Sequence, residues 1–335
     1  MKRRLGLRLA IAAFVFCFLG GIQAFAQNAY ITNDGSGTVS VIDTVTDRVL
    51  ATIPVGAAPF AVAVSPDGGT AYVANIDSNN VSAIDAATNK VIATIAVGDY
   101  PEGVAVSPDG RTVYVTNLHA NDVSVIDTAT QKATGTTPVG TEPGGVAVTP
   151  DGSKVYVANF LSNTVSVIAA PTNKVVATIT VGVHPFGVAV TPDGSTVYVA
   201  NANFGANTVS AIDTAMNSVT ATIPVGGEPG GVAVAPDGRK VYVANFLSND
   251  VSVIDTVTHK ATATIPVGSE PFGVAVTPDG CKVYVANGAS GDVSVIDTAT
   301  NKVTATIAVG SGPVALGVFI RPSVARTQSI RSCHG

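Results

Sequence analysis

Short runs of apolar, β-branched residues alternate with turn-forming residues along nearly the whole chain. One unit reads Gly-Val-Ala-Val-(Ser/Thr)-Pro-Asp-Gly, then Val-Tyr-Val-Ala-Asn, then Val-Ser-Val-Ile-Asp, and then Lys-Val-x-Ala-Thr-Ile-x-Val-Gly. The runs are bounded by Gly, Pro, Asn and Asp, and none shows the 3.6-residue apolar period of an amphipathic helix. Each unit therefore predicts four β-strands joined by tight turns.

The unit recurs seven times in phase. Its second run contains a tyrosine, and successive tyrosines are 42 residues apart, or 44 at one interval: Tyr30, Tyr72, Tyr114, Tyr156, Tyr198, Tyr242 and Tyr284. A four-stranded repeat of about 42 residues has the size of one propeller blade. We therefore predict an all-β fold, a seven-bladed β-propeller with four antiparallel strands per blade.

The first and last units are incomplete in complementary ways. The first unit begins at a second strand, residues 29–33, with no Gly-Val-Ala-Val run before it. The missing strand follows the last unit, at residues 317–320. We predict that 317–320 pairs with 29–33, so that one blade combines one C-terminal strand with three N-terminal strands. This closure would remove the exposed sheet edges of an open ring.

The recurring tetrapeptide Tyr-(Val/Ile)-(Ala/Thr)-Asn resembles that of the YVTN-repeat β-propeller family, known from archaeal and bacterial surface-layer and exported proteins. The resemblance covers about residues 28–322, with local departures such as Ala169 in place of the expected Asp. It implies an exported or cell-surface propeller. The repeats are nearly uniform, whereas propeller enzymes usually break their symmetry to build a site.

The N-terminal residues have the three-part pattern of a secretory signal peptide. A basic start is followed by an apolar stretch from Leu9 and by the small-x-small sequence Ala24-Phe25-Ala26. We predict a signal peptide at 1–26, one propeller domain at 27–322 and a tail at 323–335. No later apolar run reaches about 18 residues, so no transmembrane segment is expected in the mature chain. The expected location is periplasmic, secreted or cell-surface.

Charge is sparse and acidic. Only 12% of the residues are charged, about half the usual share, so hydroxyl, amide and backbone groups must hydrate the surface. Removal of the four basic residues of the leader leaves 14 Lys and Arg against 23 Asp and Glu. A chain of this charge does not attract phosphate groups, so nucleic acid is not expected as a partner.

Motifs for catalysis are missing from the sequence. It contains no Gly-x-Ser-x-Gly, His-Glu-x-x-His, phosphate loop or Cys-x-x-Cys-His, and its four histidines are scattered. We predict a non-catalytic binding or cell-surface structural module, with an envelope or extracellular protein or a small ligand on its loops. The alternative is a periplasmic enzyme or cofactor-handling protein, since YVTN-like repeats are similar to the propellers of d1-haem proteins, lactonases and quinoprotein-related enzymes. The functional residues of those families do not map onto this chain. No cofactor is predicted, although a divalent metal or a haem-type group stays open.

Two sets of loop residues are candidate binding positions. The loops between second and third strands carry the apolar pairs Phe160-Leu161 and Phe246-Leu247, which either contact a partner or pack as local core. The residue before the proline that opens each blade should face one mouth of the central channel: Ala58, Tyr100, Glu142, His184, Glu228, Glu270 and Gly312. Glu142, His184, Glu228 and Glu270 could bind a divalent metal or a cationic ligand, or could simply be solvated. Phe60, Phe186 and Phe272 could form apolar walls, and Glu102 lies nearby.

Two cysteines, Cys281 and Cys333, follow the leader. An exported protein meets an oxidising compartment, so they are candidates for a disulfide. The reach of the tail allows this contact without requiring it, and two free thiols are the alternative.

Overall fold

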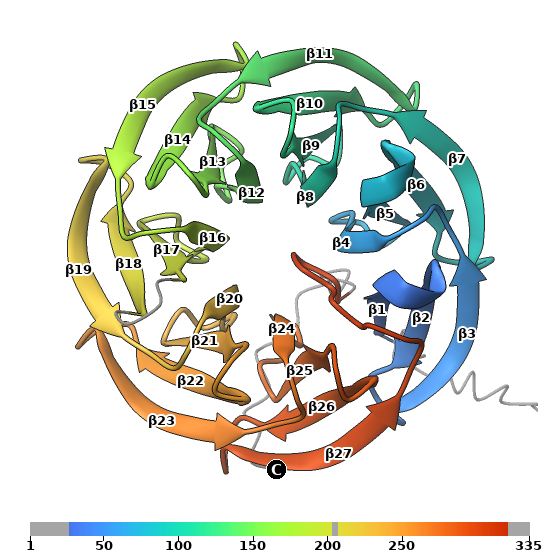
Figure 1. Cartoon of the computed structure of the whole chain (residues 1–335), viewed down its shortest axis with the longest axis vertical. Helices are drawn as coiled ribbons and strands as arrows, with labels where there is room; N and C mark the ends of the chain where they lie inside the picture. Colours follow the sequence, from blue (N-terminus) through green and yellow to red (C-terminus); the bar gives the residue numbers. More distant parts are fainter. Residues whose placement is uncertain (1–26, 203–206, 321–335) are drawn as a thin grey trace, which may run out of the picture.

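Seven four-stranded units surround a central axis in a closed ring (Figure 1). The computed structural model describes residues 27–202 and 207–320. The predicted seven-bladed, antiparallel propeller is confirmed. The predicted signal peptide at 1–26 and the tail at 323–335 lie outside the described residues.

The strands follow one another regularly along the chain. Blade 1 holds β1 (Asn28–Asn33), β2 (Thr38–Asp43) and β3 (Arg48–Pro54). Blade 2 holds β4 (Pro59–Val64), β5 (Thr70–Asn75), β6 (Asn80–Asp85) and β7 (Lys90–Ala96). Blade 3 holds β8 (Pro101–Val106), β9 (Thr112–Asn117), β10 (Asp122–Asp127) and β11 (Lys132–Pro138). Blade 4 holds β12 (Pro143–Val148), β13 (Lys154–Asn159), β14 (Thr164–Ala169) and β15 (Lys174–Thr180).

The remaining blades repeat this pattern. Blade 5 holds β16 (Pro185–Val190), β17 (Thr196–Asn201), β18 (Thr208–Asp213) and β19 (Ser218–Pro224). Blade 6 holds β20 (Pro229–Val234), β21 (Lys240–Asn245), β22 (Asp250–Asp255) and β23 (Lys260–Pro266). Blade 7 holds β24 (Pro271–Val276), β25 (Lys282–Asn287), β26 (Asp292–Asp297) and β27 (Lys302–Ala308). Two short 3-10 turns, η1 (Asp34–Ser36) and η2 (Ile76–Ser78), follow β1 and β5.

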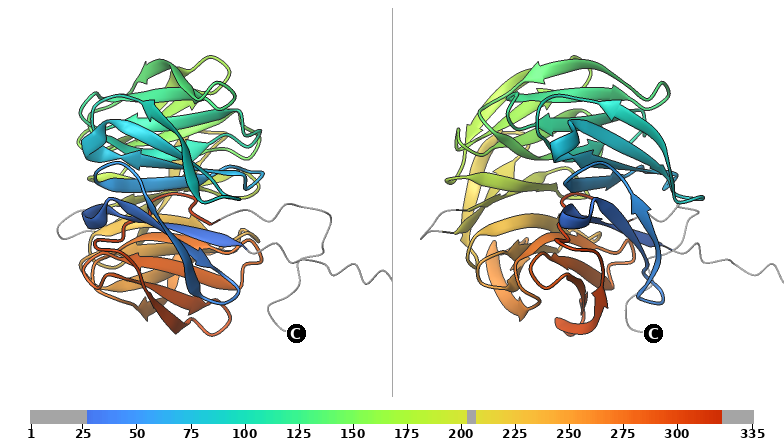
Figure 2. Two further views of the ribbon diagram at one scale, coloured as in Figure 1. Left: turned by 90° about the vertical axis from the view of Figure 1, so that its right-hand side faces the viewer. Right: turned by 45° about the vertical axis from the view of Figure 1, so that its right-hand side comes forward.

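Strand direction gives the ring two different ends. In blades 2 to 7 the first strand lies next to the axis and the fourth forms the outer wall. One end, called the loop face, carries the connections from second to third strands and from each blade to the next. The other end, called the turn face, carries the Pro-Asp-Gly turns and the connections from third to fourth strands. The left view of Figure 2 shows η1 and η2 together at the loop-face edge.

The core lies between the blades. Second and third strands are buried along nearly their whole length, whereas the fourth strands are mostly exposed. Both faces of an inner strand pack against other sheets, so valine, isoleucine and alanine run continuously instead of alternating with polar residues. The tyrosine hydroxyls lie near the third-to-fourth-strand turn of the next blade: Gln131 Nε2 donates to Tyr72 Oη at 3.1 Å, and Tyr198 Oη lies 3.4 Å from His259 Nδ1.

The asparagine of the repeated tetrapeptide stabilises the loop face of each blade. In blade 2, the fully buried Asn75 donates through Nδ2 to Asn80 Oδ1 at 2.8 Å and to Ser82 Oγ at 2.9 Å. A Cβ on Gly56 would lie only 2.6 Å from the Asn75 side chain, so this position requires glycine. The same asparagine, serine and glycine recur in every blade, which explains why these three residue types repeat.

The predicted ring closure is confirmed, with a register that the sequence did not show. Residues 312–320 run antiparallel to β1, with bridges from Ala29 to Ile320 and from Asn33 to Pro313. Tyr30 N donates to the carbonyl of Phe319 at 2.8 Å. Compared with a regular first strand, this segment has two extra residues between its proline and its final pairs.

The extra residues carry the closing segment toward blade 2. Leu316 forms a parallel bridge with Ala61, and its carbonyl accepts a hydrogen bond from Val62 N at 2.9 Å. A Cβ on Gly317 would lie 2.8 Å from the Val62 carbonyl oxygen. Segment 312–320 therefore contacts two blades, and Figure 1 shows it extending inward beside β4.

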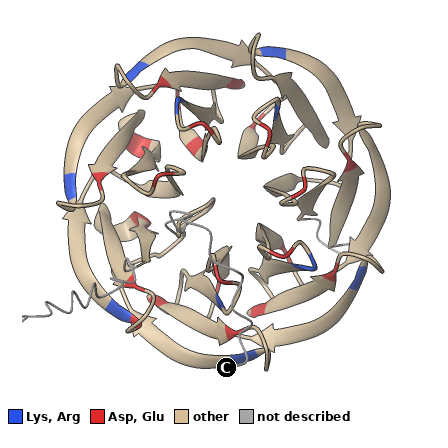
Figure 3. Ribbon diagram, turned by 180° about the vertical axis from the view of Figure 1, so that it is seen from behind, with Lys and Arg blue, Asp and Glu red and all other residues tan. Residues whose placement is uncertain are grey.

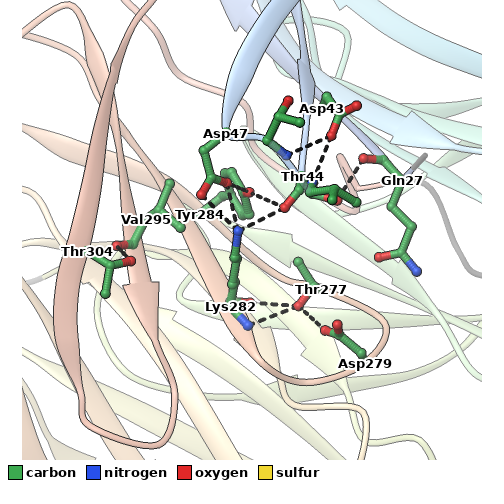
Figure 4. A network of polar contacts seen from close by, with 12 residues as sticks. Gln27, Asp43, Thr44, Asp47, Thr277, Asp279, Lys282, Tyr284, Val295 and Thr304 are labelled. Atoms are coloured by element: carbon green, nitrogen blue, oxygen red, sulfur yellow. Dashed lines mark hydrogen bonds and ion pairs between the residues drawn. The ribbon is translucent and has the colours of Figure 1, made fainter. Parts of the chain in front are cut away.

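A charged latch joins blade 7 to blade 1 on the turn face (Figure 4). Lys282 Nζ lies 2.8 Å from Asp47 Oδ2 and donates to the Thr44 carbonyl at 2.9 Å. The Tyr284 hydroxyl donates to Asp47 Oδ1. Burial, together with this bond to a carboxylate, raises the pKa of Tyr284. The residue of blade 7 that corresponds to Asp47 is Asn301, which has no charge. The charged pair is therefore a feature of the interface where the ring closes.

We expect Asp47→Asn to lower the free energy of unfolding by about 1–2 kcal/mol, because Lys282 would lose its counter-ion in a half-buried setting. Chemical denaturation at low and high salt measures this loss, which should shrink as salt rises. Asp99→Asn is the control. Asp99 lies 3.5 Å from the exposed His119 and accepts a hydrogen bond from Asn79 Nδ2 at 3.1 Å, which asparagine can still accept, so its substitution should change stability by less than about 0.5 kcal/mol. Equal effects of the two substitutions would contradict a stabilising latch.

Candidate ligand site at the loop-face mouth

Positive charge is confined to one end of the ring, whereas carboxylates lie at both ends. Every described Lys and Arg begins, or directly precedes, a strand that starts at the turn face: Arg48, Lys90, Arg111, Lys132, Lys154, Lys174, Arg239, Lys240, Lys260, Lys282 and Lys302. Figure 3 looks onto this face. The loop face instead carries Asp34, Asp77, Asp99, Glu102, Asp122, Glu142, Glu228, Asp250, Glu270 and Asp292. The loop face therefore has a strongly negative field over the described residues.

The residues that precede the blade-opening prolines form a rim on the loop face. Five of them are held through both backbone groups. Glu142 N, for example, donates to Asn121 Oδ1 of the preceding blade at 2.8 Å, and the Glu142 carbonyl accepts from Phe160 N at 2.8 Å. The backbone at Glu142 is left-handed, with φ 52°, as it is at Tyr100, His184, Glu228 and Glu270. These sequence-predicted residues thus share one repeated conformation, while their role in binding stays a prediction.

Aromatic side chains extend inward from this rim. His184 stacks on Phe160, with ring centroids 4.4 Å apart and an interplanar angle of 11°. Tyr100 contacts His119 at a centroid distance of 4.4 Å. Phe160 and Phe246 make edge contacts with Phe186 and Phe272, each at 6.3 Å. The second-to-third-strand loops therefore contact residues that follow the prolines.

The residues directly after the prolines converge on the axis. They are Phe60, Glu102, Gly144, Phe186, Gly230, Phe272 and Val314. Phe60, Phe186 and Phe272, called the axial cluster, come from blades 2, 5 and 7, which are not neighbours. Their centroids are nevertheless 5.4 Å (Phe60 to Phe272), 5.3 Å (Phe186 to Phe272) and 6.3 Å (Phe60 to Phe186) apart. The three rings meet edge to face across the channel.

Glu102 occupies the same position in blade 3 and is almost completely buried. Its side chain is 6% exposed, and no described donor lies within hydrogen-bond distance of its Oε2 atom. Burial, assisted by the negative charge of Glu142, raises the pKa of Glu102 from 4.5 to about 8. A buried carboxyl without a partner is costly to ionise, which makes this residue exceptional in the ring.

Neighbouring groups fix the position of Glu102. Thr116 Oγ1 accepts from Gly103 N at 2.7 Å and donates to the Gly144 carbonyl at 2.6 Å, which links blade 3 to blade 4 beside the carboxyl. A Cβ on Gly144 would lie 3.1 Å from the Phe186 ring and 3.5 Å from Glu102 Oε2. Glycine at 144 thus lets the carboxyl and the ring come together.

The apolar loop pairs divide into two kinds of side chain. Phe160 and Phe246 are half-buried against the axial cluster, while Leu161 and Leu247 are 49% and 56% exposed. The leucines are therefore the accessible part of each pair. Whether either kind contacts a partner stays a prediction.

We expect Leu161→Ser with Leu247→Ser to leave stability within about 0.5 kcal/mol, because both side chains are mainly solvated. Phe160→Ser with Phe246→Ser should lower the free energy of unfolding by about 2–4 kcal/mol through lost ring contacts and apolar burial. Parallel chemical denaturation of the two double variants compares them. A larger loss in the leucine variant would show that these loops pack differently.

Among the described residues, no three His, Cys, Asp or Glu side chains come close enough to hold a metal ion together. Two hollows of about 300 and 530 Å³ lie between blades on the turn face, near Tyr198 and Tyr72.

None of the described helical turns is long and apolar enough to cross a membrane. Cys333 lies outside the described residues, so its pairing with Cys281 stays a prediction.

Sequence comparison identifies the family. The model described as YNCE-like beta-propeller matches residues 105–195 and again residues 189–279, which together make up more than half of the chain. The chain belongs to the YNCE-like β-propeller family. This YNCE-like propeller also matches the Cytochrome D1 heme domain model over residues 26–144. No curated protein matches the sequence. The predicted β-propeller family is thus confirmed, while the YVTN-repeat and surface-layer attribution stays a prediction.

Solved structures share the propeller. The hydrazine synthase of Kuenenia stuttgartiensis matches with a TM-score of 0.72 and 26% identity, over 77% of this chain and 88% of that chain. A protein from Desulfotomaculum acetoxidans described as functionally unknown matches at 0.76 and 17% identity, over 87% and 100%. The dihydro-heme d1 dehydrogenase NirN in complex with DHE matches at 0.63 and 21% identity, over 83% and 62%. At such identities the last two matches show the fold alone.

The rim residues can be recognised in the sequence, whereas the buried carboxyl at its centre cannot. Glu102 was visible as a residue near Tyr100, but its burial was not. The available signal was its position directly after Pro101, where the corresponding residues of blades 2, 5 and 7 are phenylalanines. A carboxylate in a series of apolar residues could have been recognised as a residue with a special role.

Proposed function

We propose that this YNCE-like propeller is an exported, non-catalytic binding module that receives a positively charged ligand or envelope partner on its loop face. The observation that carries the proposal is the charge segregation, which leaves described carboxylates but no described Lys or Arg on that face. Complementary charge accelerates encounter and selects partners. A role as a structural module of the cell surface would use the same face for contact.

The rim supports binding rather than catalysis. Its side chains project from backbones that are held by hydrogen bonds on both sides, so the face is a rigid platform. Binding sites commonly lie on loops that a rigid scaffold positions.

A haem-carrying role is the second candidate, because of the match to the cytochrome D1 heme domain. The described loop face does not fit such a group. Haems carry carboxylate side chains, which bind most strongly to Lys or Arg, and the described loop face has neither while it carries many carboxylates of its own. The axial cluster also fills the centre of the mouth with three packed rings. We therefore assign no haem chemistry to these residues.

Binding of oligolysine of about ten residues to the purified protein tests the proposal. The dissociation constant should rise steeply with salt. A loop-face variant, Glu142→Gln with Glu228→Gln and Glu270→Gln, should bind about tenfold more weakly, since each exposed charge pair contributes about 0.2–1 kcal/mol. The matched turn-face variant is Asp109→Asn with Asp151→Asn and Asp237→Asn, in which asparagine can still accept the turn hydrogen bonds. Equal weakening by both variants would refute a specific role for the loop face.

A further inference from the structure

The carboxyl of Glu102 is the strongest unexplained feature of the mouth. Its side chain is more than nine-tenths buried, and its Oε2 atom has no hydrogen-bond partner among the described residues. Buried polar groups in proteins are nearly always satisfied, so an orphaned carboxyl oxygen points to a missing partner. That partner must donate hydrogen bonds or carry positive charge.

The surroundings of Glu102 restrict the chemistry of that partner. The nearest side chain across Gly144 is Phe186, whose ring belongs to the axial cluster. Aromatic rings offer no ligand atoms to calcium or magnesium, which take six or more oxygens, whereas ring faces attract organic cations within about 6 Å. One carboxylate beside phenylalanines thus favours an ammonium group with attached carbon over a metal ion.

The partly exposed rings of the axial cluster are the route by which a ligand would approach Glu102. Phe60, Phe186 and Phe272 are each half-buried, so part of each ring is open to solvent. The rings already pack closely against Gly144 and Gly230, where an added Cβ would lie 3.1 and 3.2 Å from Phe186 and Phe272. The ammonium group must therefore displace part of a ring to reach Glu102 Oε2, and rotation of partly exposed side chains is fast.

We propose that Glu102 and the axial cluster form a binding site for a small organic ammonium ion, whose charge pairs with the carboxylate and whose alkyl groups lie against the phenylalanine rings. This inference rests on the proposed function, because the acidic loop face supplies the field that concentrates cations at the mouth. Beyond that function, the ligand is now specified as a small organic ammonium ion, and Glu102 is the residue that pairs with its charge. Because burial raises the pKa of Glu102 to about 8, the carboxyl must release its proton when the ion binds below that pH, so affinity should increase as the pH approaches 8.

Calorimetric titration of the full mature protein with tetramethylammonium and butylammonium chloride tests the site. Wild-type protein should bind at least one of them, and tert-butanol, a neutral analogue, should not bind. Glu102→Gln should weaken binding at least tenfold. Asp237→Asn also removes one carboxylate, but on the turn face, and should alter affinity less than twofold. Phe186→Leu, which keeps an apolar side chain but removes the ring, should weaken tetramethylammonium binding several-fold.

The outcomes separate this inference from the proposed function. Binding that is equal in wild type and Glu102→Gln, or no binding of either ammonium ion at about 10 mM, would overturn the site. If oligolysine still bound the loop face in that case, the proposed function would stand without it. Ammonium binding that depends on Glu102, together with oligolysine binding that ignores the rim carboxylates, would support the site and reject the broader proposal.

Discussion

A chain that ends at Gly310 should fail to fold cooperatively or should melt far below the full-length protein. Truncation removes Phe319, Ile320 and Leu316, which are all buried, and each such side chain contributes about 1.5–3 kcal/mol. It also exposes β1 as a sheet edge and removes the bond from Tyr30 N to the Phe319 carbonyl. The sum approaches the whole stability of an ordinary domain, about 5–15 kcal/mol.

Thermal and chemical denaturation, both under reducing conditions, measure this effect without any contribution from a Cys281 to Cys333 disulfide. A chain that ends at Pro322 keeps the closing segment and serves as the control, with stability expected near that of the full-length protein. Phe319→Ala in the full chain should cost about 3–5 kcal/mol, because this ring is fully buried. Equal melting of the Gly310 and Pro322 chains would show that closure does not stabilise the ring.

Glu102→Gln should stabilise the protein, and the gain should grow with pH. Below pH 4.5 the Glu102 carboxyl is protonated in both folded and unfolded chains, so it imposes little penalty. Between pH 4.5 and about 8 the unfolded chain releases this proton while the folded chain retains it, so the free energy of unfolding falls as pH rises. Above about pH 8 both states are ionised and the penalty is constant. Each pH unit in this window corresponds to about 1.4 kcal/mol, so the gain should reach a few kcal/mol.

Denaturant midpoints of wild type and Glu102→Gln at about pH 4.5, 6 and 8 give the difference directly, because other titrating groups are shared. Glu270→Gln is the control on the same face, and its difference from wild type should stay nearly constant because Glu270 is exposed. A Glu102→Gln gain that is the same at all three pH values would show that the carboxyl is ionised in the folded protein at low pH, contrary to its burial.

The sequence by itself determined the strands, the turns, the number of blades and the partner of the first strand. These features follow from patterns within one repeat or from comparing repeats. Pro, Asp and Gly determine backbone angles locally, and a missing first strand in one unit is matched by an extra strand after another. The segregation of charge was also available from the sequence, because strand direction places Lys90 or Lys282 at one end and Glu142 or Glu270 at the other.

Only the tertiary structure decided which side chains meet at the axis. Phe60, Phe186 and Phe272 lie far apart in the chain and belong to blades that are not adjacent. No local sequence pattern therefore shows that their rings pack together. The burial of Glu102 depends on the absence of a side chain at Gly144 and on the ring of Phe186 from a different blade. The register of residues 312–320 likewise depends on contacts with blade 2. Closing seven sheets into a ring brings their first strands to one axis. The space and the charge around each side chain at the axis therefore depend on residues from several blades.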